Sequence, residues 1–160
     1  TTTLRVRTTA SRRHTCAILF SGSAACWGPA HAPSAPSASP AAVGLSAPPV
    51  SMSAVSSSIS SLSLGLHHSC ATHSGLVTCW GSGQFGQLGV GDSLSRDLGN
   101  ALATVLSSVS QIAVGLFHTC AVLSDRSLRC WGLNSDAQLG LGNRRNQGAG
   151  EEDLEALVVE

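Results

Sequence analysis

The sequence lacks lysine and tyrosine, and it has few large or charged side chains. Aromatic residues make up 4% of the 160 residues and charged residues 11%, so a compact core built on large side chains is not expected. No basic patch is interleaved with aromatic residues, which argues against nucleic-acid binding. Proline and serine interrupt every apolar stretch, so there is no run of about 18 apolar residues that could span a membrane. We expect a soluble chain that neither binds nucleic acid nor spans a membrane.

The charges are distributed unevenly, although the formal net charge is zero. Residues 1–91 contain four arginines and no acid, whereas residues 92–160 contain nine acids and five arginines. This asymmetry favours head-to-tail orientation of neighbouring molecules, although arginines among threonines are also typical of a solvated strand face. No signal peptide is visible and the first residue is Thr1, which indicates a processed chain or a segment of a longer one.

Three segments of the chain share the pattern His-x-Cys-Ala followed by Cys-Trp-Gly. Their first cysteines are 54 and 50 residues apart and their tryptophans 53 and 51, a period that fits one four-stranded propeller blade. Apolar residues alternate with small ones before each of the second and third copies, which favours strands over helices. The anchoring residues are His14, Cys16, Cys26 and Trp27, then His68, Cys70, Cys79 and Trp80, then His118, Cys120, Cys130 and Trp131.

The third segment resembles a full repeat of the regulator of chromosome condensation family, in the cysteine-bearing variety common in secreted and bacterial-type members. Its matching elements are residues 112–123, 128–134 and 138–142, the last beginning Gln-Leu-Gly. The second segment agrees with it over most of this length. Residues 1–54 match only through the core pattern, with Ser11 in place of a strand-end glycine and without the Gln-Leu-Gly turn.

The resemblance implies an all-β fold of about three four-stranded β-propeller blades. Since propellers of this family typically close with about seven blades, the ring is incomplete and two sheet flanks stay open. We divide the chain into a degenerate first blade (1–54), a second blade (55–105) and a third blade with an acidic tail (106–160). Within the tail, residues 156–159 could begin the outer strand of the next blade. Because of its open flanks, the isolated chain is not expected to be a stable monomer.

The six cysteines form three pairs whose members are 9 or 10 positions apart. If Cys70 faces Cys79 in an antiparallel hairpin, a two-residue loop, Ser74-Gly75, remains. The other two hairpins have three-residue loops, whose last residue must tolerate the left-handed region. Gly22 fits that position and Arg126 fits it poorly.

Residues that face each other across a hairpin lie within disulfide distance. We therefore favour the bridges Cys16–Cys26, Cys70–Cys79 and Cys120–Cys130, which would place the chain in an oxidising compartment. Reduced core cysteines and a metal site are the alternatives, but zinc sites usually have short Cys-x-x-Cys knuckles, and none occurs. No metal or cofactor is expected. The three repeat histidines are expected to hydrogen-bond neighbouring backbone, and the three tryptophans to pack between sheets.

Residues 29–49 are rich in proline, serine and alanine and predict an extended, polyproline-like loop. One interpretation is a plain flexible loop. The other rests on a resemblance to the hydroxyproline-glycosylated stretches of algal and plant extracellular glycoproteins, and no Asn-x-Ser/Thr acceptor occurs in the chain. The candidate positions for sugar are Pro33, Pro36, Pro40, Pro48 and Pro49.

These features favour a non-catalytic, extracellular scaffold that contacts other protein chains in a larger surface assembly or filament. The alternative, implied by the family name, is an intracellular propeller that binds a small GTPase or chromatin as a nucleotide exchange factor. An enzyme is not expected, because the aspartates are scattered and neither a nucleophile elbow nor a phosphate-binding loop is present.

Overall fold

The chain folds into three antiparallel sheets without a helix in the described residues, as the all-β prediction requires. The computed structural model describes residues 7–19, 21–28, 50–51, 58–96, 104–148 and 156–157. The proline-rich segment 29–49, with its five candidate sugar positions, lies outside these ranges. Among the described residues, no helix is long and apolar enough to cross a membrane.

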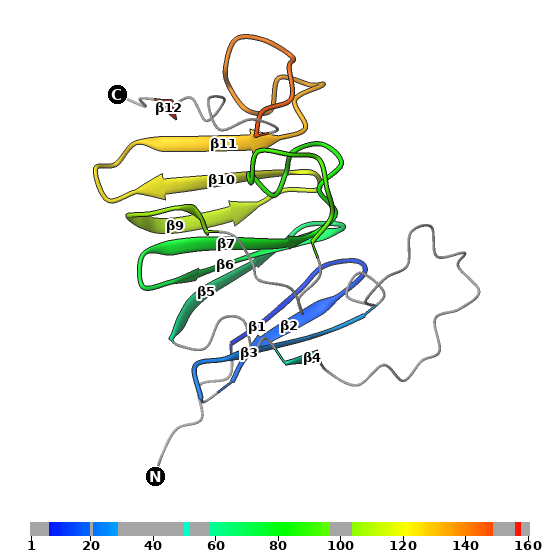
Figure 1. Cartoon of the computed structure of the whole chain (residues 1–160), viewed down its shortest axis with the longest axis vertical. Helices are drawn as coiled ribbons and strands as arrows, with labels where there is room; N and C mark the ends of the chain where they lie inside the picture. The colour runs from blue at the N-terminus through cyan, green and yellow to red at the C-terminus, as the bar shows by residue number, and fades with distance from the viewer. Residues whose placement is uncertain are drawn as a thin grey trace, which may run out of the picture.

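Each sheet has four strands, and the sheets follow one another along the long axis of the molecule (Figure 1). Neighbouring strands within each sheet are consecutive in sequence, which is the order of a propeller blade. The first blade contains β1 (Arg7–Ala10), β2 (Thr15–Ile18), β3 (Ala24–Trp27) and β4 (Val50–Ser51). The second contains β5 (Ile59–Leu64), β6 (His68–His73), β7 (Leu76–Gly81) and β8 (Thr104–Leu106). The third contains β9 (Val109–Val114), β10 (His118–Leu123), β11 (Leu128–Gly132) and β12 (Ala156–Leu157).

The acidic tail supplies the last strand of the third blade. Ala156 pairs with Arg129 and Leu157 pairs with Leu128, so β12 lies beside β11. For Ala156 and Leu157, the suggestion that this segment begins the outer strand of a following blade is therefore wrong. The apolar residues at this point complete the sheet that the preceding hairpin leaves with an open edge.

The central hairpin of each blade has the predicted register. Cys16, Cys70 and Cys120 pair with Cys26, Cys79 and Cys130 respectively, and His73 pairs with Leu76 to leave the two-residue turn.

In the third blade Arg126 has a φ of 74°, close to the 81° of Gly22 in the first. Hydrogen bonds within the turn stabilise this unfavourable backbone: the Arg126 amide donates to the Leu123 carbonyl (3.0 Å), and two bonds join the residues on either side of Arg126. The Asp125 carboxylate accepts bonds from the Ser127 amide (2.8 Å) and hydroxyl (2.7 Å).

All six cysteines are joined in disulfides inside these hairpins. The Cα atoms of each bridged pair are 4.1 Å apart, as expected for directly facing residues. The bridges are Cys16–Cys26, Cys70–Cys79 and Cys120–Cys130. On the chain-entropy model, a loop of this length contributes about 2.5–3 kcal/mol of stability per bridge.

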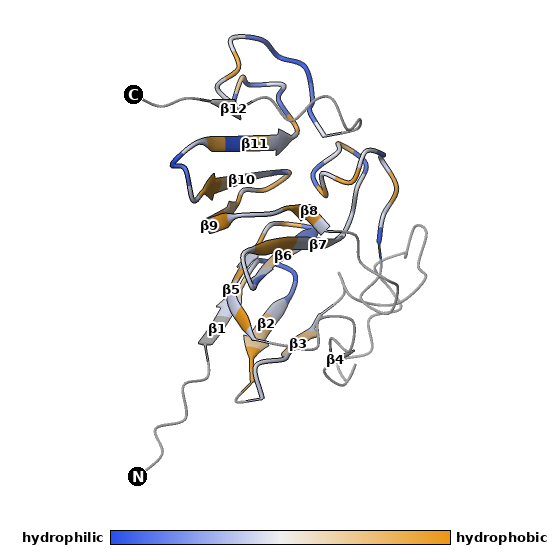
Figure 2. Cartoon of the chain, turned by 60° about the vertical axis from the view of Figure 1, so that its left-hand side comes forward, coloured by the Kyte–Doolittle hydropathy of each residue, from blue (hydrophilic) through white to orange (hydrophobic). Residues whose placement is uncertain are grey.

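The apolar core lies between adjacent blades, and each junction combines a disulfide with one tryptophan. Cys16 and Cys26 pack against Trp80 at the first junction, and Cys70 and Cys79 pack against Trp131 at the second. Figure 2 shows apolar residues on the strands, whereas hydrophilic residues mark the β10–β11 turn and the loop after β11. Disulfide sulfur and an indole ring are thus part of the core at both junctions.

Candidate functional site

The junction between the second and third blades contains a hydrogen-bond network centred on one main-chain carbonyl. The Gln87 carbonyl accepts bonds from the Trp131 Nε1–H (3.0 Å) and the Thr119 hydroxyl (3.1 Å). The side chain of Gln87 holds its own turn in place, because Gln87 Oε1 accepts a bond from the Phe85 amide at 2.8 Å. Gln87, Thr119 and Trp131 are all fully buried. These bonds set the distance and register between the two blades.

The repeat histidines extend this network from one blade to the next. His68 Nε2 lies 2.9 Å from Thr119 Oγ1. Since the single hydroxyl proton of Thr119 is donated to the Gln87 carbonyl, His68 must be the donor and carries its proton on Nε2. At the first junction His14 Nε2 lies 2.6 Å from Ser69 Oγ. The expectation that these two rings bond neighbouring backbone is therefore wrong: each binds the hydroxyl that precedes the first cysteine of the next blade.

Burial keeps these histidines neutral. Desolvation by burial, with a smaller contribution from neighbouring histidines, lowers the pKa of His68 to about 3. Desolvation, followed by the influence of His67, lowers the pKa of His14 to about 4. Desolvation also lowers the pKa of His118. A neutral imidazole that donates through Nε2 is the form that the network requires.

The strand-end position before each histidine differs between the blades. A Cβ atom on Gly65 would lie 2.5 Å from the Gly115 carbonyl oxygen and 2.7 Å from His68 Cε1, so only glycine fits there. In the first blade this position is Ser11, whose Oγ lies 3.0 Å from His14 Nδ1. The serine that departs from the repeat pattern thus provides a partner for the second ring nitrogen.

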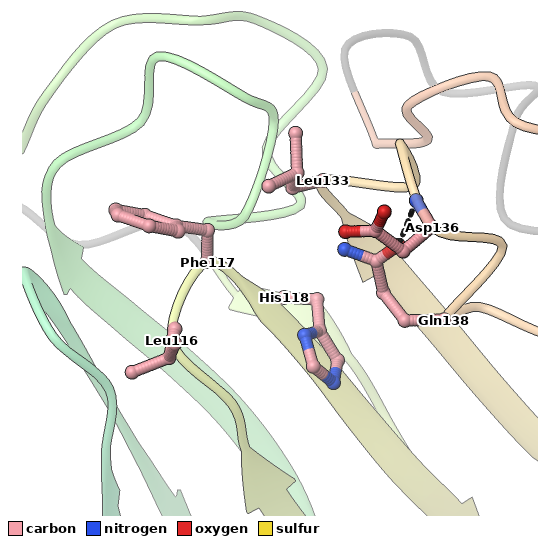
Figure 3. A pocket seen from close by; sticks show the side chains of 6 residues that line it. All are labelled: Leu116, Phe117, His118, Leu133, Asp136 and Gln138. Atoms are coloured by element: carbon pink, nitrogen blue, oxygen red, sulfur yellow. Dashed lines mark hydrogen bonds between the residues drawn. The ribbon is translucent and has the colours of Figure 1, made fainter.

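The outer side of the third blade has a hollow where the next junction would form. A cavity of about 320 Å³ is lined by Leu116, Phe117, His118, Leu133, Asp136 and Gln138. Figure 3 shows His118 between the Leu116–Phe117 loop on one side and the Asp136 and Gln138 side chains on the other. We call this surface the C-terminal flank.

His118 and Gln138 hold the same positions in the C-terminal flank that His68 and Gln87 hold in the preceding junction. Gln138 Oε1 accepts a bond from the Asp136 amide at 2.9 Å, as Gln87 does from Phe85. The sheet face beside them is incompletely covered. Cys120 and Leu128 are half-buried, whereas the matching Cys70 and Val77 of the second blade are fully buried.

The opposite end of the arc presents the complementary surface. Trp27 is 36% exposed, while Trp80 and Trp131 are completely buried. The prediction that the tryptophans pack between sheets holds for these last two. Thr15 precedes Cys16 as Thr119 precedes Cys120, and it is half-buried where Thr119 is fully buried. We call the surface with Thr15 and Trp27 the N-terminal flank.

The roles of Gln87, Ser69 and Thr119 were not predicted from the sequence. A signal was available, since each repeat has serine or threonine between histidine and cysteine, and two repeats share the Gln-Leu-Gly turn. Among the described residues, no group of three His, Cys, Asp or Glu side chains could hold a metal ion.

The fold and the network define a class of protein, the β-propeller made of repeated four-stranded blades. The model of the regulator of chromosome condensation (RCC1) repeat matches residues 74–122, and a second model of the same repeat matches residues 109–138. Residues 74–138 thus match RCC1 repeats, here in a cysteine-bearing variety, and the three sheets resemble blades of an RCC1 propeller, of which they form an incomplete ring. No curated protein sequence matches it.

Solved propellers are similar over nearly the whole chain. The structure of Prp20p from Saccharomyces cerevisiae is 25% identical with a TM-score of 0.72, covering 96% of this chain and 36% of that one. Yeast RCC1 (Prp20) bound to Kap60 gives 24% identity, a TM-score of 0.71, and coverages of 96% and 35%. Human WBSCR16 gives 21% identity, a TM-score of 0.70, and coverages of 98% and 40%. The chain spans little more than a third of the length of these propellers.

Proposed function

We propose that the chain is a non-catalytic scaffold for protein interactions, located outside the cell or at its surface. The observation that carries this proposal is the presence of one disulfide in every blade, of which the first two are buried in the junctions between blades. Disulfides persist in oxidising compartments and are rare in the cytosol and nucleus. The RCC1-type propeller fold supports binding of other proteins.

The bridges are well placed to stabilise blades that have little other apolar material. Cys16, Cys26 and Cys70 are fully buried, and their neighbours in the core are aliphatic side chains, alanines and one indole per junction. Small repeat units depend on such covalent links when large side chains are scarce. Reduction would leave pairs of thiols in the junctions. The unfolded chain would then no longer be restricted by the bridges, and the folded chain would lose their contribution to stability.

The proline-rich segment 29–49 gives a second, independent test of location. We propose that it carries hydroxyproline-linked or serine-linked sugar at the outer surface of the assembly, with Pro33, Pro36, Pro40, Pro48 and Pro49 as the favoured positions. Its composition offers nothing to bury. Intact-mass measurement of native protein and sequencing of glycopeptides from this segment test the idea. An unmodified segment would contradict it.

The competing function is nucleotide exchange on a small GTPase together with chromatin binding. It is favoured by the 25% identity to Prp20p, a protein whose binding to Gsp1p and histones has been described. The buried disulfides speak against it, because an intracellular exchange factor works in a reducing compartment.

Fractionation of the producing cells distinguishes the two functions. Antibody against the chain should detect it in the medium or the washed cell-surface fraction, and alkylation at harvest should find all six cysteines oxidised. The same native protein should not accelerate release of labelled GDP from a small GTPase such as Gsp1p. Recovery in the cytosol or nucleus with free thiols, together with accelerated nucleotide release, would establish the alternative.

A further inference from the structure

The loop that follows β11 (Figure 1) carries two adjacent arginines at its tip. Arg144 and Arg145 are both exposed, and so is Asn146, which comes after them. At the base of the loop Gly132 and Gln147 form an antiparallel bridge, with main-chain hydrogen bonds of 2.8 and 3.1 Å. The arginine pair therefore projects into solvent from a closed and well-anchored loop.

The exposure of this tip can be compared with that of the equivalent loop after β7, which is also closed by a main-chain bridge at its base. There the Leu94 amide donates to Asp92 Oδ1 at 2.9 Å. The Arg145 amide donates to Asn143 Oδ1 at 2.8 Å, so Arg145 holds the position of Leu94. Residues 93–95 are exposed although the third blade packs against the second, and Leu94 is 64% exposed. This tip position thus faces solvent even where a neighbouring blade is in place.

One buried asparagine holds both ends of the tip. Asn134 is completely buried; its Nδ2 donates to the Asn143 carbonyl at 2.9 Å, and its amide donates to Asn146 Oδ1 at 2.9 Å. Gly142, just before the tip, has a φ of 69° and no atom within 4 Å of the place where a Cβ would lie. A glycine in open space allows the backbone of the tip to change its direction. The two arginines between these anchors can therefore be presented to a partner without disturbing the blade.

We propose that the peptide bond between Arg145 and Asn146 is a processing site for an endoprotease that recognises paired basic residues. Exposed loop tips are the preferred places for proteolytic cleavage, and carboxylates in two adjacent subsites bind a pair of guanidinium groups well. In the cleavage, water supplies a hydroxyl to the Arg145 carbonyl carbon and a proton to the Asn146 nitrogen as the bond between them breaks. The inference rests on the proposed extracellular function, because a secreted chain meets such enzymes on its route out of the cell.

The second arginine pair of the chain lacks the geometry for cleavage. Arg12 and Arg13 are also exposed, but the next residue, His14, is only 3% exposed. The His14 amide donates to Ser11 Oγ at 3.2 Å, and its ring lies 2.6 Å from Ser69 Oγ in the first junction. Cleavage after Arg13 would therefore require local unfolding of that junction. The accessibility of the residue after the pair distinguishes the two sites.

The segment that begins at Asn146 should remain bound after cleavage. Gln147 keeps its two main-chain bonds to Gly132, and β12 stays paired with β11. Gly148 lies close to the second blade, since a Cβ on it would be 2.7 Å from the Gly86 carbonyl oxygen. We therefore expect a cleaved protein whose two pieces separate only on denaturation.

Treatment of the purified, oxidised chain with a kexin-type endoprotease, which cuts after paired basic residues, tests the site directly. Mass spectrometry should find one cut, after Arg145, and the two pieces should elute together in gel filtration and separate in urea. The variant Arg144→Ser/Arg145→Leu gives this tip the residues of the equivalent loop and should lose the cut. Arg12→Ser/Arg13→Leu is the matched control and should be cut as fast as the parent. Circular dichroism verifies that both variants are folded.

Native protein provides the second measurement. Digestion with a protease that does not cut at arginine should yield a peptide ending at Arg145 and another beginning at Asn146. A native chain that is continuous through residues 144–146, or cleavage by the kexin-type enzyme as fast after Arg13 as after Arg145, would overturn the proposal. This failure is separable from that of the scaffold function: an extracellular, fully oxidised chain without the cut would remove the processing site and leave the scaffold proposal intact.

Discussion

The two junctions of the arc use the same histidine–hydroxyl bond in different surroundings. At the first junction, His14 bonds to Ser69 and receives a second partner from Ser11. At the second, the bond from His68 to Thr119 continues to the Gln87 carbonyl, which also accepts a bond from Trp131. The comparison shows that the histidine contact does not require the Gln-Leu-Gly turn.

Replacing a tryptophan should give the largest loss of stability, and the loss should differ between Trp131, inside the second junction, and Trp27, at the N-terminal end of the arc. Trp131→Ala removes a completely buried ring and its bond to Gln87, and should lower the free energy of unfolding by about 3–5 kcal/mol. Trp27→Ala, on the open flank, should cost well under half of that. Denaturant titration at one fixed, low protein concentration measures both. Equal losses would show that the flank tryptophan is packed as tightly as the internal one.

Acid should destabilise both junctions. His14 and His68 have folded pKa values of about 4 and 3, lowered chiefly by burial, against about 6.5 in the unfolded chain. Their contribution is therefore fully present above pH 6.5 and is lost as the pH falls toward the folded values, because the unfolded state binds the protons. At pH 5 the loss should be roughly 2 kcal/mol per histidine.

Urea unfolding at pH 7.5 and pH 5.0 measures this difference. In the variant His68→Gln the difference should shrink by roughly 2 kcal/mol, since one of the histidines with a lowered pKa is gone. Unchanged stability between the two pH values would contradict the buried, neutral state of both rings.

Removal of the hydroxyl that each histidine bonds should cost different amounts of stability at the two junctions. Thr119→Val leaves both His68 Nε2 and one bond of the Gln87 carbonyl without a partner, and should cost about 1–3 kcal/mol. Ser69→Ala removes only the partner of His14 Nε2 and should cost less. Thermal unfolding of the two variants side by side provides the comparison. A larger loss of stability for Ser69→Ala than for Thr119→Val would contradict this account of the two junctions.

The smallest effect should come from the serine that distinguishes the first junction. Ser11→Gly restores the residue found in the other blades and removes the bond to His14 Nδ1, at a cost of about 0.5–1.5 kcal/mol. The NMR titration of His14 should also shift. If the variant were more stable than the parent, the bond to Nδ1 would be of no value to the fold.

The hairpins could be predicted from sequence because the cysteine spacing, the loop lengths and the turn glycines agree in three copies. Arg126 shows the limit, since its left-handed backbone depends on bonds to Asp125 that spacing does not reveal. The partners of the histidines could not be predicted, because they belong to the next blade and lie 55 and 51 positions away. The prediction for residues 156–159 was wrong for a similar reason. An apolar sequence around Ala156 suits any sheet edge, and only the pairing of Ala156 with Arg129 identifies the sheet that it joins.

Peptide mapping of native protein without reduction tests the central claim, that each blade is closed by its own disulfide, most directly. Cleavage must fall inside the hairpins, after Phe20, Leu76 and Arg126, so that bridged halves stay joined until reduction. We predict three linkages, Cys16–Cys26, Cys70–Cys79 and Cys120–Cys130, and no alkylated cysteine. Linkages between blades, or six free thiols, would contradict both the structure of the junctions and the extracellular function built on it.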